Sequence, residues 1–500
     1  MSVIPDLLSS WSAARPDSMA IAVDGGGSLT YAQWESCSNA AAHALLSRGV
    51  GRGDRVALYF TGLEWLEYAV AYMGVLKSGA TAMHLSDTLP PAEMRRRFDE
   101  CAAGGIIHGT RPAPFTADWA APAAALDGAR TDRPDVGLTS QDIADILYTS
   151  GTTGLAKAFT NPHGNPTHGR GIEGVQSLDE WKPVIAPIPL STTASVTTLV
   201  TTALTTPAPF VLCAPWDEER VAALVAERRA GSLMGTPWTA IRMVNARVHT
   251  RHDLTGLTLM AFSSATLPPA TALALREMVP GVRILTAYSQ AEASPAVILN
   301  EFDPARPLAT GLPAPGTGLM VCDERGRSLP AGEVGEIRLS TSAPGRRYLS
   351  DALNRTEFVQ DWKRTGDLGL LDEDGMLYLV DRSADVMRGA DGRPVYSIEI
   401  EAALYAHPAI SEAAVVGIPA SGRRGGRERQ TMVAVVVSAD GSVPEDLGAF
   451  LADTLPGRCV PQRFLAWPDL PRGTTGKVLK REVCARLTAD RGVRPEGELA

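Results

Sequence analysis

The segment YTSGTTGLAK, residues 148–157, constrains this chain more than any other feature, because it joins a short apolar strand to a loop suited to an anion. We expect the strand over DILYTS, which begins at Asp145. Glycine tolerates positive φ angles, and small side chains let backbone N–H groups approach a phosphate closely. Hydroxyl groups and a lysine add charge-assisted hydrogen bonds. The residues expected around the phosphates are Thr149, Ser150, Gly151, Thr152, Thr153, Gly154 and Lys157.

Two other interpretations of this loop exist. Its spacing differs from the GxxxxGK[ST] pattern, which disfavours a Walker-type ATPase or GTPase. Clusters of serine, threonine and glycine are also common in solvated turns, so these ten residues alone leave an ordinary turn open.

Three downstream segments decide between these interpretations. They are AYSQAE ending at Glu292, RTGDLGLLDEDGMLYLVDRSAD over 364–385, and LPRGTTGK ending at Lys477. With the 148–157 loop, and in this order, they resemble motifs of the ANL superfamily of adenylate-forming enzymes: YGxTE, TGD…DR and PRxxxGK. That superfamily comprises acyl-CoA and aryl-CoA synthetases, nonribosomal peptide adenylation domains and firefly luciferase. The resemblance spans most of the 500 residues.

Length, charge and cysteine spacing exclude several classes of protein. A chain of 500 residues exceeds one ordinary core, so two or more domains are expected. The net charge of −9, without a basic run, argues against nucleic-acid binding. Six widely spaced cysteines predict buried thiols in a reducing cytosol. Neither the N-terminus nor the apolar region 196–213 is typical of a signal peptide or membrane span, so we expect a cytoplasmic protein without a membrane partner.

The apolar pattern predicts an α/β fold. Helical and strand-like spacings alternate through the first 300 residues, which indicates layers with mostly parallel strands. Near Gly318 the pattern changes to two β-hairpins, with turn signals DERG and DEDG. We expect a large N-terminal domain over 1–381, with layered α/β sheets and a β-rich subdomain, and a small α+β domain over 386–500. The resemblance implies that 382–385 is a hinge and that the small domain is a mobile lid, which rotates between two half-reactions.

The resemblance also implies roles in binding ATP and magnesium. The 149–157 loop would hold the β- and γ-phosphates, with Thr152 as a catalytic candidate. Glu292, a second catalytic candidate, would bind Mg²⁺, which prefers one or two carboxylates together with phosphate oxygens. Tyr288 would pack against adenine.

The remaining candidates surround the ribose and the reacting groups. The resemblance implies that Asp367 accepts both ribose hydroxyls, since a carboxylate is an acceptor only, and that Arg382 contacts the ribose. Lys477, the third catalytic candidate, would bridge the acyl carboxylate and the α-phosphate when the lid closes. Taken one at a time, these charged residues are also compatible with hairpin-end or surface positions.

Departures from the family motifs bear on the substrate pocket. Thr192 lies where a histidine or aromatic gate is common, and Thr193 near the aspartate that binds an α-amino group in peptide synthetases. Without that carboxylate an α-amino acid is disfavoured. Ser263 and Ser264 replace glycines, and their hydroxyls would be left unpaired against a long acyl chain. A small aromatic or functionalised acid is therefore expected.

Other departures bear on the phosphate loop and the second half-reaction. Ala156 and Ala158 replace a proline and a glycine of the loop. Ala384 stands where relatives carry aspartate or lysine, and the stretch 385–401 is one residue longer than usual. The basic segment SGRRGGRER, residues 421–429, is a candidate for binding the CoA nucleotide or an acidic carrier protein, and is otherwise a solvated loop.

The expected function is ATP-dependent activation of a small aryl or short functionalised acid. It would give an acyl-AMP and pyrophosphate, with transfer to CoA or to the phosphopantetheine of an acyl carrier protein. Two alternatives remain. One is an adenylate-forming enzyme with a non-thiol second step, such as a diazotase that uses nitrite and an aryl amine. The other is a catalytically weak nucleotide-binding or regulatory protein. The presence of all four charged residues of the family motifs argues against it: Glu292, Asp367, Arg382 and Lys477.

Overall fold

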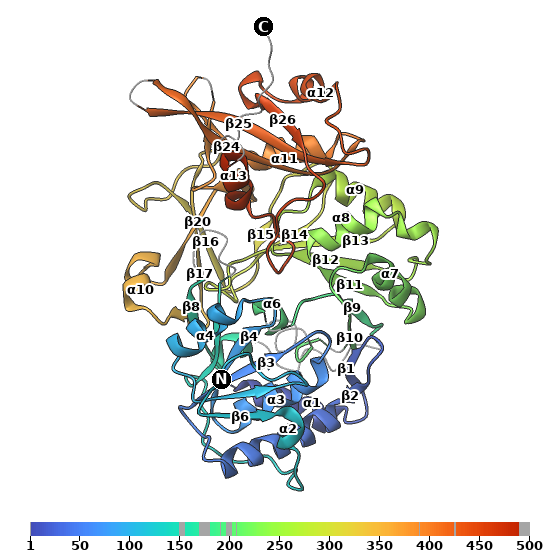
Figure 1. The fold of residues 1–500 in the computed structure, drawn as a ribbon, viewed down its shortest axis with the longest axis vertical. Coiled ribbons are helices and arrows are strands. Elements are labelled where there is room, and N and C mark those ends of the chain that lie inside the picture. The colour runs from blue at the N-terminus through green and yellow to red at the C-terminus, as the bar shows by residue number, and fades with distance from the viewer. Residues whose placement is uncertain are drawn as a thin grey trace.

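The computed structural model describes residues 2–149, 156–169, 181–190, 192–196, 203–206, 208–389, 391–424 and 427–489. A large N-terminal part, blue to yellow in Figure 1, carries a smaller C-terminal part in orange and red. Both parts combine helices with sheets, so the α/β architecture predicted from the sequence is confirmed.

A seven-stranded sheet lies near the N-terminal end. Its order is β18-β8-β7-β4-β3-β5-β6, and its strands are β3 (Arg55–Phe60), β4 (Thr81–Ser86), β5 (Gly105–His108), β6 (Trp119–Pro122), β7 (Ile143–Tyr148), β8 (Ala158–Pro162) and β18 (Arg347–Tyr348). The five strands from β7 to β6 are parallel, while β8 and β18 are antiparallel. The strand predicted before the glycine-rich loop is β7, which is almost wholly buried, as expected for a parallel strand covered on both faces.

A nine-stranded sheet follows, in the order β15-β14-β13-β12-β11-β9-β10-β1-β2. Its strands are β1 (Met19–Val23), β2 (Ser28–Thr30), β9 (Val184–Ala186), β10 (Phe210–Leu212), β11 (Ser232–Gly235), β12 (Leu259–Ser263), β13 (Arg283–Tyr288), β14 (Ile298–Glu301) and β15 (Leu312–Pro313). The six strands from β13 to β1 are parallel. Because parallel strands end at a common edge, Ser263 pairs with Ala287, the neighbour of Tyr288.

Helices cover these two sheets. They are α1 (Ile4–Ala14), α2 (Tyr31–Ser47), α3 (Trp65–Lys77), α4 (Pro91–Glu100), α5 (Gly164–Thr167), α6 (Thr193–Val196), α7 (Glu218–Glu227), α8 (Pro237–Asn245) and α9 (Pro269–Met278), with short 3₁₀ turns η1 (Ala123–Leu126) and η4 (Val248–Thr250). One core contains side chains of α1, α2 and α3 together with Leu58 of one sheet and Phe210 of the other. Helices α2 and α3 pack so closely that a Cβ on Gly74 would lie 2.7 Å from Cβ of Ala41. The two sheets are thus fixed relative to each other by shared helices.

An antiparallel sheet contains the two predicted hairpins. Its order is β16-β17-β20-β19, with β21 paired to β20, and its strands are β16 (Thr317–Cys322), β17 (Gly335–Thr341), β19 (Phe358–Val359), β20 (Trp362–Leu371) and β21 (Leu377–Arg382). Helix α10 (Asp351–Glu357) precedes β19. The register of β20 and β21 places Asp367 opposite Arg382, so the hairpin itself brings these two candidates together.

The C-terminal part combines a three-stranded sheet, β24-β25-β26, which has helices on both faces, with a separate two-stranded sheet, β22-β23. It contains β22 (Met387–Arg388), β23 (Pro394–Val395), α11 (Ser397–Tyr405), β24 (Ile410–Arg424), β25 (Arg427–Ser438), α12 (Leu447–Thr454), η5 (Gly457–Cys459), β26 (Arg463–Ala466) and α13 (Lys480–Ala489). Along β25, Ala434 and Val436 pack with α11 and α12, whereas Val433 and Val435 pack with α13. This alternation follows from the two-residue period of a strand.

Two expectations differ from the structure. Cys37 is exposed and Cys484 is partly exposed, whereas the other four cysteines are buried as predicted. Cys37 lies on helix α2, directly before the buried stretch 38–42, at a position that the rest of the chain leaves uncovered. The segment 421–429 is not simply a loop, because β24 extends to Arg424 and β25 starts at Arg427. No helix of the described ranges is both long and apolar enough to span a membrane.

Candidate active site

Asp367 is the centre of one polar cluster, and it is only 4% exposed. Its Oδ1 lies 3.2 Å from Nε of Arg382, across the β20–β21 hairpin. Its Oδ2 accepts hydrogen bonds from the Tyr288 hydroxyl at 2.8 Å and from Nε2 of Gln290 at 3.0 Å. Donors from two different sheets therefore hold one carboxylate in a single orientation, as a site that positions a ligand requires.

Lys477 comes from the C-terminal part but lies close to this cluster. A tight turn presents it: the Gly473 amide donates to the Lys477 carbonyl at 2.9 Å, and the Gly476 amide to the Gly473 carbonyl at 2.9 Å. Gly476 has a φ of 80°, which favours glycine. Burial lowers the pKa of the Lys477 ammonium to about 8; the charge of Arg382 acts in the same direction and that of Asp367 opposes it. The two parts of the chain thus meet around these charges.

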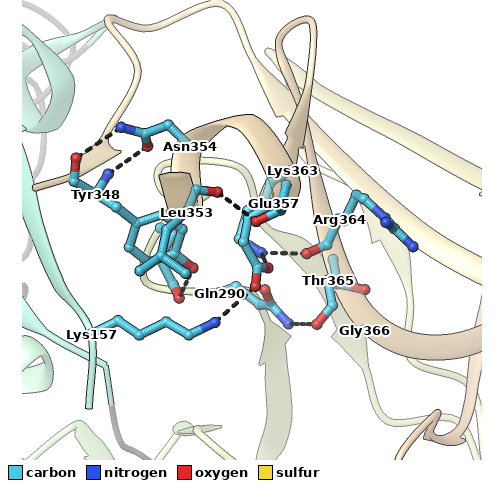
Figure 2. Close-up of polar contacts among 12 residues, drawn as sticks. Lys157, Gln290, Tyr348, Leu353, Asn354, Glu357, Lys363, Arg364, Thr365 and Gly366 are labelled. Carbon is cyan, nitrogen blue, oxygen red and sulfur yellow. Dashed lines mark hydrogen bonds and ion pairs between the residues drawn. The ribbon is translucent and has the colours of Figure 1, made fainter. Parts of the chain in front are cut away.

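Glu292 belongs to a second cluster, whose Tyr348 and Lys157 are labelled in Figure 2. Its Oε1 accepts a hydrogen bond from the Tyr348 hydroxyl at 2.8 Å. Tyr348 is 4% exposed, and burial together with the Glu292 charge raises the pKa of its phenol, so the phenol stays protonated and donates. The ammonium of Lys157 lies 5.6 Å from the centroid of the Tyr348 ring, within cation–π range. Glu292 and Lys157 therefore contact the same tyrosine.

Lys157 is also bound to a carboxylate that the sequence did not single out. Figure 2 shows it reaching toward Glu357 of α10, with Nζ 2.8 Å from Oε1. The buried Lys363 lies 3.0 Å from the other oxygen of Glu357. Burial raises the pKa of Glu357, but the hydrogen bonds from both lysines outweigh it, and the pKa is lowered. A carboxylate held ionised in this way keeps Lys157 in one place.

The phosphate loop is described only at its two ends. The Thr149 amide donates to the Lys157 carbonyl at 3.1 Å, and the Lys157 amide donates to Oγ1 of Thr149 at 3.0 Å. These bonds close the base of the loop. The predicted residues between them, Ser150, Gly151, Thr152, Thr153 and Gly154, lie outside the described residues.

The four pocket candidates lie in two places, two of them at the start of α6 and two at the end of β12. Oγ1 of Thr193 donates to the Tyr148 carbonyl at 3.3 Å, at the end of strand β7. Thr192 precedes α6, and its Oγ1 accepts from the Ser195 amide at 3.2 Å. Ser263 and Ser264 are exposed at the end of β12. The structure thus places the threonines beside the entry to the phosphate loop and the serines beside the strand that ends in Tyr288.

Sequence reasoning missed several residues of the two clusters. Gln290 lies inside the quoted AYSQAE segment, but spacing alone does not indicate that it contacts Asp367. Tyr348, Glu357 and Lys363 come from other elements and meet their partners only in the folded chain. No sequence signal in this chain alone identifies them.

The carboxylate of Glu292 fits a magnesium ion whose other ligands are phosphate oxygens and water. Within the described parts of the chain, no group of three or more His, Cys, Asp or Glu side chains could hold a metal. Mg²⁺ in nucleotide sites commonly uses one or two carboxylates, water and substrate phosphates. Glu292, oriented by Tyr348, fits that requirement.

Comparisons with known proteins identify the family and the fold of this chain. The profile of the AMP-binding enzyme family matches residues 8–349, and that of the AMP-binding enzyme C-terminal domain matches residues 399–477. A feruloyl-CoA synthase from an Amycolatopsis species is 30% identical over 498 residues, covering 96% of this chain and 99% of its own. A fatty acid–acyl-carrier-protein ligase from Streptomyces coeruleorubidus is 30% identical over 526 residues, covering 93% of each. The crystal structure of an anthranilate CoA ligase with anthranoyl-AMP has the same fold, with a TM-score of 0.85, 22% identity and 98% of both chains covered.

Proposed function

Because this chain belongs to the AMP-binding enzyme family, and is an AMP-forming, acid–thiol ligase-like enzyme, we propose that it activates a small aryl or short functionalised acid. The acid carboxylate attacks the α-phosphorus of ATP, the bond to pyrophosphate breaks, and an acyl-AMP forms. A thiol then attacks the acyl carbon and AMP leaves. Relatives that use CoA and one that loads a carrier protein support either thiol as the acceptor.

The observation that carries this proposal is the half-buried Lys477 beside Asp367 and Arg382. Negative charge builds up on the α-phosphate during the attack, and a pre-positioned cation stabilises it. Lys477 would supply that cation, Asp367 and Arg382 would hold the ribose, and Tyr288 would pack against adenine. Fixing the two reactants in one place supplies much of the remaining rate enhancement.

The second cluster would bind the phosphates that leave. We assign the β- and γ-phosphates to the loop from Thr149 to Lys157, including Thr152, and Mg²⁺ to Glu292. Lys157 and Glu292 share Tyr348 as a neighbour, which supports a common role for them.

We place the domain division at 1–381, 382–385 and 386–500. Arg382 ends strand β21, and the preceding Asp381 accepts a hydrogen bond from the Ser397 amide at 2.6 Å, at the start of α11. The link between the two parts is therefore short. Ala384 within it is exposed and carries no side-chain charge.

The proposed preference for a small acid rests on the hydroxyls near the end of β12 and the start of α6. Thr192, Thr193, Ser263 and Ser264 would form hydrogen bonds with a polar or aromatic acid, and a long alkyl chain would leave them unpaired. The two relatives described above are named for different acids, since one is a feruloyl-CoA synthase and the other a fatty acid ligase.

Pyrophosphate release with a panel of acids tests the function. Ferulate, benzoate, anthranilate and octanoate would each be incubated with ATP and Mg²⁺, with and without CoA. We expect acid-dependent pyrophosphate with an aryl acid, and a thioester when CoA is present. Pyrophosphate that requires nitrite and an aryl amine would favour a non-thiol second step instead. ATP binding without turnover for any of these would contradict the proposal.

The lowered pKa of Lys477, about 8, predicts a pH dependence of adenylation. The ammonium is charged below this pH and loses its proton as the pH rises through it. Since the charged form is required, kcat/KM for pyrophosphate release should fall by about tenfold per pH unit above about pH 8. The guanidinium of Lys477→Arg keeps its charge at these pH values. The decline with pH should therefore disappear in this variant, whether or not its maximal rate is lower than that of the wild type. The same decline in Lys477→Arg would show that another group titrates.

A further inference from the structure

A tryptophan of the large part contacts an arginine of the small part, close to the Lys477 turn. Trp238 is the second residue of α8, and the guanidinium carbon of Arg472 lies 3.5 Å from the centroid of its ring. A second guanidinium, that of Arg242, lies 5.5 Å from the same centroid and is held by Glu218. The elements around this contact also meet, since α8 contacts β24 and α9 contacts α11. In Figure 1, α8 and α9 lie below the C-terminal part.

Arg472 links the tryptophan to the turn that carries Lys477. Its Nη1 donates to the Gly476 carbonyl at 2.8 Å. It is also ion-paired with Glu412, a buried residue of β24. Burial lowers the pKa of Arg472 to about 10, so the side chain remains charged at neutral pH. A cation on an aromatic ring interacts more strongly when water is excluded from it.

The turn itself is shaped to fit the ring. A Cβ on Gly476 would lie 2.7 Å from both Cβ and Cδ1 of Trp238, closer than a carbon side chain tolerates. Only glycine lets the backbone before Lys477 rest on the indole. The ring therefore touches the turn in two ways, through Arg472 and through the Gly476 backbone.

We propose that Trp238 is a positioning residue, which holds the Lys477 turn against the large part for the adenylation half-reaction only. This inference rests on the proposed function, and on the rotation of the lid that the family resemblance implies. When the lid leaves this position for the thiol step, the contact between Trp238 and Arg472 must break. Removing the indole should therefore weaken the first half-reaction and spare the second.

The test compares Trp238→Ala with the wild type in each half-reaction. Acid-dependent ATP–pyrophosphate exchange, measured with ferulate or whichever panel acid is fastest, should fall by about 30-fold. This is the effect of losing about 2 kcal/mol from a desolvated cation–π contact at 1.36 kcal/mol per factor of ten. Transfer from the chemically prepared adenylate of the same acid to CoA should change by less than about twofold, since it does not need this contact. Trp238→Phe keeps an aromatic face and should recover most of the exchange rate.

A second measurement does not depend on the substrate. Hydrogen–deuterium exchange of the 470–480 segment should be faster in Trp238→Ala, because the Gly473 and Gly476 amides lose the packing that protects their turn. Trp467→Ala is the matched control, since Trp467 pairs with Arg486 inside the small part; we expect unchanged ratios between the half-reactions.

Each outcome decides the inference. Unchanged exchange in Trp238→Ala, or an equal loss in both half-reactions, would overturn it. If the wild type gives no pyrophosphate exchange with any acid, the proposed function fails, and protection of the 470–480 segment still reports whether Trp238 holds the turn.

Discussion

Lys477→Ala is expected to lower acid-dependent pyrophosphate release by about 10²- to 10³-fold, because it removes the cation beside Asp367, the carboxylate that we propose binds the ribose. The Lys477 side chain is half-buried, and the charges of Asp367 and Arg382 both affect its pKa. Water that enters after the substitution therefore cannot supply the lost positive charge. ATP binding should weaken far less, since the phosphate loop and Asp367 remain. A stopped assay of pyrophosphate with the best panel acid measures the change.

The same variant should keep the second half-reaction. Transfer of the acyl group from a prepared acyl-AMP to CoA does not build charge on the α-phosphate in the same way, and it should stay within about fivefold of the wild type. Arg481→Ala is the control, because it removes an exposed positive charge from the same part of the chain. Pyrophosphate release that is unchanged in Lys477→Ala would remove Lys477 from its assigned role.

Asp145→Ala is expected to lower the free energy of unfolding of the N-terminal part by about 3–5 kcal/mol, as when one member of a buried hydrogen-bonded or ion-paired group is removed. Asp145 lies on β7 and is fully buried. Its Oδ1 lies 3.0 Å from Nε2 of His84, and its Oδ2 accepts from Nδ2 of Asn161 at 2.9 Å. The substitution leaves both partners without the carboxylate in an interior that water does not reach.

Asp361→Ala provides the contrast. Its side chain is 86% exposed and lies 3.3 Å from Arg347, so we expect a loss of less than about 1 kcal/mol. Urea unfolding followed by circular dichroism compares the two variants. Equal midpoints for Asp145→Ala and the wild type would contradict the importance of the buried carboxylate.

The buried cluster around Asp145 continues to the active site. Nε of the buried Arg346 donates to Oδ1 of Asn161 at 3.0 Å, and its Nη1 donates to the Ala291 carbonyl at 2.6 Å. Ala291 directly precedes Glu292. We therefore expect the loss of Asp145 to disturb the Glu292 side of the site as well as the core.

Local features of this chain could be predicted from the sequence. Strand β7 and the loop after it follow from an apolar run that ends in small residues, and both hairpins follow from apolar runs around DERG and DEDG. The second hairpin also accounts for the pairing of Asp367 with Arg382. The prediction failed where local signals were weak, as at Cys37 and in the 421–429 segment.

The sequence by itself determined the order of the elements, the family and the charged candidates, because periodicity, turn residues and motif spacing act over short stretches of chain. Only the tertiary structure decided the partners of those candidates. Lys157 and Glu357 are 200 residues apart, and Trp238 meets Arg472 across two parts of the molecule. Such contacts depend on how whole sheets and helices pack against one another, and no short stretch of residues carries that information.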